Sequence, residues 1–210
     1  MAILDIQIIN SSLRDIQGAL SATIEEGSWI STSYLVAEII IIPLAAWLTM
    51  VMSARRFAVV ISSCFVLASL LCSLAWSLES MVVFRVLQGL AGGALIPFAF
   101  MLVLTKLPPP DRPKGMAMFA VTATFAPSIG PTIGGWLTQN YGWEYIFYIN
   151  IVPGLVMIAG LLYGLEKSAP RWELLKQGDY LGILTMALGL GCLQVFLEEG
   201  HRKDWLESNL

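Results

Sequence analysis

The chain has 210 residues, of which 57% are hydrophobic and 13% are charged, and its formal net charge is −3. Soluble globular domains carry about 25% charged residues. With a mean hydropathy of +0.73, this composition excludes an ordinary soluble domain and indicates an integral membrane protein. The basic residues form neither a patch nor a tail, so no nucleic-acid partner is expected.

The sequence contains little of the chemistry that enzymes use. His201 is the only histidine, and Cys64, Cys72 and Cys192 lie in apolar runs without metal-ligand spacing. No nucleophile–base pair and no phosphate-binding loop are recognisable. We therefore expect no enzyme, no metal site and no cofactor. A membrane enzyme remains a remote alternative.

The first residues are apolar but short for a membrane span. Met1–Ile9 is interrupted only by Asp5 and Gln7, whereas a spanning helix needs about 20 apolar residues. We expect 1–10 to be the end of a truncated first transmembrane helix and 11–28 to be a periplasmic loop.

Six later stretches have the length and composition of membrane spans. They are Trp29–Val51, Phe57–Leu78, Met81–Thr105, Gly115–Leu137, Tyr145–Leu165 and Tyr180–Leu197. The predicted fold class is therefore an all-α integral membrane protein. Transmembrane helices two to six would occupy 29–165, a cytoplasmic loop 166–179, a seventh transmembrane helix 180–197 and a periplasmic tail 198–210.

Lysine and arginine alternate between the connections and so predict the orientation. Three alternate connections are basic, namely those with Arg55 and Arg56, with Lys106, Arg112 and Lys114, and with Lys167, Arg171 and Lys176. The intervening connections hold few basic residues. We expect the basic connections to face the cytoplasm.

Three ionisable residues lie within the apolar stretches, namely Asp5, Glu38 and Arg85. Such residues cost at least about 2.5–3.5 kcal/mol near the membrane centre and mark functional sites. Asp5 and Arg85 both lie near the outer ends of their spans, so an ion pair between them is expected. Gln88 follows Arg85 by about one turn and shares its helix face.

Glu38 lies deeper than the other two. At 1.5 Å per residue it is roughly 14 Å below Trp29, near the middle of a hydrocarbon core about 30 Å thick. An acid that is neutral when shielded and charged when wetted is a candidate proton carrier. Tyr34, one turn earlier, is a candidate hydrogen-bond donor to its charged form.

Each of these residues also has a simpler interpretation. Glu38 would be a protonated structural glutamate bonded to a neighbouring helix. Arg85 would snorkel to the near surface, and Asp5 would mark a helix end at the membrane interface.

Small residues recur in two places. In Ala126–Trp136, residues Ala126, Gly130 and Gly134 follow at intervals of four, so one helix face carries almost no side chain and allows another helix to approach closely. Pro127 and Pro131 are expected to bend this helix. A second small-residue patch, Gly89, Gly92 and Gly93, follows Arg85, and an ordinary close-packed helix pair is the simpler interpretation of such spacing.

Several segments, in order, resemble one transporter family. They are LDIQIIN (Leu4–Asn10), SYLVAEIIIIPLAAWL (Ser33–Leu48), RVLQGLAGG (Arg85–Gly93), GPTIGGW (Gly130–Trp136), GWEYIFYINIVPG (Gly142–Gly154) and LQVFLEEGHRKDW (Leu193–Trp205). They resemble the EmrB/QacA branch of the major facilitator drug:proton antiporters, which have fourteen helices. The connection after the second helix departs from that pattern, because Ala46, Met50 and Ser53 stand where the family has glycine, an acid and glycine.

The resemblance implies a role for each matching residue. Asp5 and Arg85 would take part in proton coupling, Arg55 and Arg56 would belong to a cytoplasmic gating loop, and the hinge of the antiporter motif would consist of Gly130, Pro131, Gly134 and Gly135. Glu38 joins the proton-coupling set on its depth alone, and Tyr34 and Gln88 are candidates for the substrate cavity.

The resulting hypothesis is a proton-coupled multidrug efflux antiporter in the bacterial inner membrane. It would export hydrophobic or amphipathic compounds by alternating access, and this chain would be its N-terminal six-helix half plus a seventh helix. A periplasmic adaptor and an outer-membrane channel are the partners that the resemblance implies. The alternative is a non-transporting truncated fragment or a membrane assembly subunit.

Overall fold

The computed structural model describes residues 1–200, and within them the chain forms helices and no strands. The α-helices are α1 (Ala2–Ala19), α2 (Ile24–Met52), α3 (Ala54–Ser73), α4 (Leu78–Lys106), α5 (Arg112–Tyr141), α6 (Tyr145–Tyr148), α7 (Ile151–Gly164) and α8 (Tyr180–Gly200). Two short 3-10 helices, η1 (Pro109–Asp111) and η2 (Trp172–Gln177), lie in connections.

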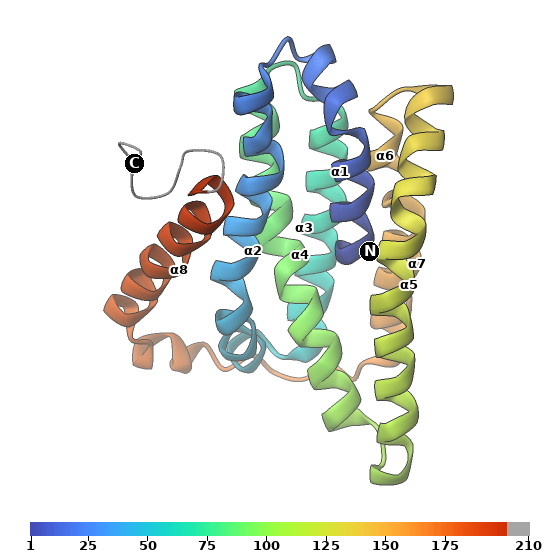
Figure 1. Ribbon diagram of the computed structural model, residues 1–210. Coiled ribbons are helices and arrows are strands. Elements are labelled where there is room, and N and C mark those ends of the chain that lie inside the picture. The colour runs from blue at the N-terminus through green and yellow to red at the C-terminus, as the bar shows by residue number, and fades with distance from the viewer. Residues whose placement is uncertain (201–210) are drawn as a thin grey trace.

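The first four helices form the centre of the molecule. Figure 1 shows α5 and α7 along one side of this bundle and α8 against α2 on the other. Within the bundle α4 packs along both α2 and α3, while α5 packs on α1 and α7 packs on α3. The segment that leads to α8 crosses beneath the bundle (Figure 1).

The predicted spans are confirmed as helices. Six helical segments of the described chain are long and apolar enough to cross a membrane, and they match the six predicted stretches within a few residues at most ends. Internal prolines do not interrupt them, because Pro43, Pro97, Pro127 and Pro131 all lie inside continuous helices.

The predicted loop at 11–28 is wrong. The first helix continues to Ala19, the second begins at Ile24, and only 20–23 connect them. Hydropathy missed this extension because half of its side chains are polar, but Ser12 and Ile16 are buried whereas Arg14 and Asp15 are exposed. A helix with one buried face is stabilised by packing whatever its mean hydropathy.

Local capping explains where two helices begin. Thr23 and Glu26 form a reciprocal capping box at the start of α2, and Ser77 and Ser80 form another at the start of α4. Each satisfies backbone N–H groups that have no partner inside the helix. Both capped ends lie at the same end of the bundle, shown at the top in Figure 1.

The three basic connections share the opposite end of the bundle. The links α2–α3, α4–α5 and α7–α8 all lie at the bottom of Figure 1. This arrangement agrees with the alternation of basic residues, and the cytoplasmic assignment of that end stays a prediction. Of the predicted tail at 198–210, α8 includes the part up to Gly200, and 201–210, with His201, lie outside the described residues.

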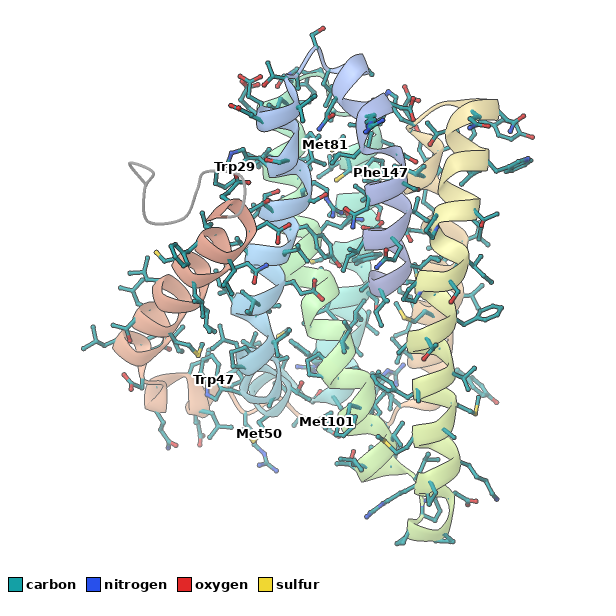
Figure 2. All side chains as sticks on the ribbon, in the orientation of Figure 1. Trp29, Trp47, Met50, Met81, Met101 and Phe147 are labelled. Carbon is teal, nitrogen blue, oxygen red and sulfur yellow. The ribbon has the colours of Figure 1, made fainter. Side chains whose placement is uncertain are left out.

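Apolar packing flanks a polar layer along α4. Met81 and Phe147 belong to a buried cluster near one end of the bundle, where Figure 2 labels them. Phe57 and Phe98 belong to a second buried cluster toward the other end. Along α4, Arg85 falls between Met81 and Phe98, so its guanidinium lies in the interior between two apolar clusters.

Candidate functional site

The predicted ion pair between Asp5 and Arg85 is present. Arg85 Nη1 lies 2.8 Å from Asp5 Oδ2, and both side chains are almost fully buried. Arg85 Nε also donates to the Ile30 carbonyl oxygen at 3.1 Å. The snorkelling interpretation of Arg85 and the interfacial interpretation of Asp5 are therefore wrong, because both groups point into the bundle.

Gln88 joins the pair into a network. Its Oε1 accepts from Arg85 Nη1 at 2.6 Å, and its Nε2 donates to Asp5 Oδ1 at 3.1 Å and to Ser69 Oγ at 2.7 Å. The shared helix face of Arg85 and Gln88 was predicted from their spacing. Ser69 was not, since α3 carries several serines and the sequence does not distinguish the one that faces the network.

Asn150 is the functional candidate that the sequence reasoning missed. It follows α6 at the start of α7, and its Nδ2 donates to Asp5 Oδ1 at 2.5 Å. The signal was available, because Asn150 is the only amide side chain in the stretch Tyr145–Leu165. Asp5 thus receives donors from Arg85, Gln88 and Asn150, and its two carboxylate oxygens are well satisfied.

Tyr34 contacts the network in a way that was not predicted. The Arg85 guanidinium carbon lies 4.1 Å from the centre of the Tyr34 ring, a cation–π arrangement. The Tyr34 hydroxyl has no hydrogen-bond partner within the described residues, so the expected donation to Glu38 is absent. Tyr34 and Gln88 are both fully buried, and their role as substrate contacts stays a prediction.

Glu38 is isolated by comparison. Its side chain is 9% exposed, and within residues 1–200 it makes neither a salt bridge nor a side-chain hydrogen bond. The alternative of a glutamate bonded to a neighbouring helix is therefore not what the structure shows. A buried carboxyl group without partners is costly in its charged form.

The glycine patch on α4 explains how closely α2 approaches. A Cβ added at Gly93 would lie 2.7 Å from the Glu38 carbonyl oxygen, and one at Gly89 would overlap the Tyr34 backbone. Only glycine permits this approach. The helix that carries Tyr34 and Glu38 is therefore in close backbone contact with α4.

The antiporter-motif glycines make a second close contact, between α5 and α1. A Cβ at Gly134 would lie 2.8 Å from the Ile8 carbonyl oxygen, and one at Gly130 would lie 2.6 Å from the Gln7 Cβ. Gly135 has nothing within 4 Å of such a Cβ, and Pro131 is exposed. Two of the four motif residues, Gly130 and Gly134, therefore pack against α1. The role of the motif as a hinge stays a prediction.

The basic loop between α2 and α3 contains a strained residue. Ser53 has φ 72°, a left-handed conformation that favours glycine. This conformation explains why the pattern of the drug:proton antiporters has glycine at the position of Ser53. Arg55 and Arg56 follow directly in the first turn of α3, and their gating role stays a prediction.

No cluster of three or more metal-ligating side chains occurs in residues 1–200. The ionisable side chains of the site include Asp5, Arg85 and Glu38, and of these Asp5 and Arg85 form a charge pair.

Comparison with known proteins decides the family. Residues 1–204 match the Major Facilitator Superfamily. The chain belongs to this superfamily. The bacterial homologue of the human lysosomal transporter Spinster, in an inward-facing and unoccupied conformation, shares the fold with a TM-score of 0.63 at 18% identity, over 80% of this chain and 41% of that one.

Curated relatives narrow the branch. The chain is 43% identical over 206 residues to the colistin resistance protein EmrB of Acinetobacter baumannii, covering 98% of this chain and 40% of that protein. It is 38% identical to the multidrug export protein EmrB of Haemophilus influenzae, over 100% of this chain and 41% of that protein. It is 34% identical to EmrB of Escherichia coli K12, over 99% and 40%.

These relatives confirm the predicted resemblance to the EmrB branch. With the six apolar spans, they make the chain a multi-pass protein of the bacterial inner membrane. The superfamily is one of transporters rather than enzymes. The chain spans about 40% of the length of the relatives that it matches.

Proposed function

We propose that this protein acts in proton-coupled multidrug efflux and exports hydrophobic or amphipathic compounds by alternating access. The observation that carries the proposal is the buried Asp5–Arg85 ion pair, which joins α1 to α4 in the interior of the bundle. The similarity of the chain to multidrug export proteins of the EmrB branch supports drug-like compounds as the substrates.

The network offers a means to couple a proton to helix movement. Asp5 holds α1 to α4 through Arg85 and Gln88, and to the start of α7 through Asn150. Protonation of Asp5 would remove the charge that Arg85 pairs with and one oxygen acceptor. The contacts between these helices would weaken at the same moment, which is what a switch between two packings needs.

Glu38 is proposed as the acid that exchanges the coupling proton. Among residues 1–200 it has no hydrogen-bond or salt-bridge partner to release when it gains or loses a proton, and it lies on α2 beside the close contact with α4. A change of its charge would therefore act at the boundary between two tightly packed helices. Tyr34 and Gln88 would meet substrate in a conformation in which these helices separate.

Transport by a Glu38→Gln variant tests the assignment. The expected result is loss of proton-coupled export, since glutamine keeps the shape and cannot ionise. Drug efflux from cells and drug-induced proton movement in everted vesicles are the measurements. Glu25→Gln, which changes an exposed acid in the first turn of the same helix, is the control and should transport normally.

The outcome that contradicts the assignment is equally clear. Normal transport with normal proton coupling in Glu38→Gln would remove Glu38 from the mechanism. If Asp5→Asn abolished coupling in the same vesicles, the ion pair would carry the proton instead. Retention of coupling in both variants would contradict proton exchange at this site altogether.

The proposal includes a periplasmic adaptor and an outer-membrane channel as partners. It rests on the resemblance to exporters that work in such assemblies. Crosslinking in intact cells followed by purification should recover an adaptor with the protein. Recovery of the protein without any periplasmic partner, in cells that are exporting drug, would contradict this part.

A further inference from the structure

A cavity of about 460 Å³ lies at the basic end of the bundle, between the N-terminal end of α3 and the segment that follows α7. It is distinct from the Asp5–Arg85 network, and none of the residues assigned to proton exchange lines it. Its lining has a basic part, here called the cationic wall, and an apolar part.

Three basic side chains line the cationic wall. They are Arg55 and Arg56 from α3 and Lys167 from the segment after α7. None of them makes a salt bridge within residues 1–200, and no acidic side chain lines the cavity. The acids nearest along the chain, Glu166 and Glu173, do not line it. The cavity therefore carries an uncompensated positive charge.

Ser53 supplies an independent sign of a missing partner. It lines the same cavity and is only 8% exposed, yet its hydroxyl has no hydrogen-bond partner within the described residues. Its side chain also does not cap α3. The first-turn N–H groups of a helix attract anions, and a 20-residue helix begins at this point. An anionic oxygen would satisfy both the hydroxyl and the helix end.

The other wall is suited to hydrocarbon. Val60 and Leu162 line it and are 43% and 44% exposed, on the surfaces of two membrane-spanning helices. Trp172 also lines the cavity and is 53% exposed, and tryptophan favours the boundary between membrane and water. A ligand that fits both walls has an anionic head and an apolar tail.

We propose that this cavity binds the phosphate headgroup of an anionic membrane phospholipid, with its acyl chains against Val60 and Leu162. Basic pockets between transmembrane helices hold anionic headgroups in this way. The lipid would join the start of α3 to the segment after α7, because the cations come from both. The inference does not depend on which compound is transported.

Native mass spectrometry of the purified full chain in detergent tests the proposal. Phosphatidylglycerol is compared with phosphatidylcholine of the same acyl chains. The first bound molecule of phosphatidylglycerol is expected to bind more tightly than the first bound molecule of phosphatidylcholine. The triple variant Arg55→Gln, Arg56→Gln and Lys167→Gln should weaken that binding by about 100-fold, since each cation near a membrane surface contributes about a fivefold factor.

A matched triple variant changes the other basic connection, at Lys106, Arg112 and Lys114. This variant removes the same charge, but its three residues line no part of this cavity. It should therefore weaken the binding of phosphatidylglycerol by less than about threefold. Equal losses in the two triple variants would overturn the proposal in favour of general electrostatic attraction. Equal binding of phosphatidylcholine and phosphatidylglycerol would overturn it as well.

Two further measurements separate the headgroup from other causes. Ser53→Gly suits the positive φ and should keep the thermal stability while weakening binding by about tenfold, because it deletes a hydrogen bond to a charged group. Brominated phosphatidylglycerol should quench tryptophan fluorescence less in Trp172→Phe than in the unchanged protein. Displacement of the lipid by millimolar glycerol 3-phosphate would overturn the proposal, because the site would then bind a small anion.

Discussion

Two buried acids of this protein have opposite surroundings. Asp5 pairs with Arg85 and also accepts from Gln88 and Asn150, whereas Glu38 has no side-chain partner within the described residues. Both cost free energy when charged in the membrane interior. The difference indicates that a change at Asp5 disturbs the helices that it joins, whereas a change at Glu38 breaks no hydrogen bond or ion pair seen in residues 1–200.

The largest expected effect comes from removal of the cation. Arg85→Met leaves Asp5 buried without its counter-charge, which costs about 3–5 kcal/mol when one partner of a buried pair is lost. Thermal unfolding of the purified protein should show a large decrease in melting temperature. Arg14→Gln changes an exposed arginine of α1 and should shift stability by no more than about 0.5 kcal/mol. Equal melting temperatures for the two variants would show that the pair does not stabilise the bundle.

A smaller effect is expected from the amide that joins α7 to Asp5. Asn150→Ala removes one donor to the carboxylate and should cost about 1–3 kcal/mol, again measured by thermal unfolding. Asn140→Ala is the matched control, because Asn140 is exposed and donates only to the Trp136 carbonyl of its own helix. If Asn150→Ala were no more destabilising than Asn140→Ala, the contact of Asn150 with Asp5 would contribute nothing to stability.

The smallest effect on stability is expected at Glu38. Glu38→Gln removes no hydrogen bond or ion pair seen in residues 1–200 and should change the free energy of unfolding by less than about 1 kcal/mol. Asp5→Asn, measured beside it, should be clearly more destabilising because it removes the partner of Arg85. A reversal of this order would contradict the distinction between a paired and an unpaired acid.

Much of this arrangement was predictable from sequence. The spans follow from long apolar runs, because only helices satisfy their own backbone in lipid. The Asp5–Arg85 pair follows from depth, since two opposite charges at one level in a membrane have few other partners. The shared face of Arg85 and Gln88 follows from helical spacing.

Other features were not predictable, for physical reasons. The extension of α1 to Ala19 depends on packing of Ser12 and Ile16 against neighbouring helices, which mean hydropathy does not detect. Ser69 contacts Gln88, and Asn150 contacts Asp5, only because α3 and the start of α7 are placed around the network. The Tyr34 ring contacts the Arg85 guanidinium, and its hydroxyl makes no hydrogen bond to Glu38 among the described residues, which depends on how closely α2 and α4 approach at the α4 glycines.

By itself, the sequence determined that this chain is a helical membrane protein with costly charges at defined depths. Hydropathy and spacing are properties of single segments, and charge alternation compares successive connections, so none of the three requires knowledge of how the helices pack. Only the tertiary structure decided that Ser69 and Asn150 join the network of Asp5, Arg85 and Gln88, and that the Tyr34 ring lies against the Arg85 guanidinium. These contacts join helices far apart in the chain, where Asp5 meets three donors and, in the described part of the chain, Glu38 meets none.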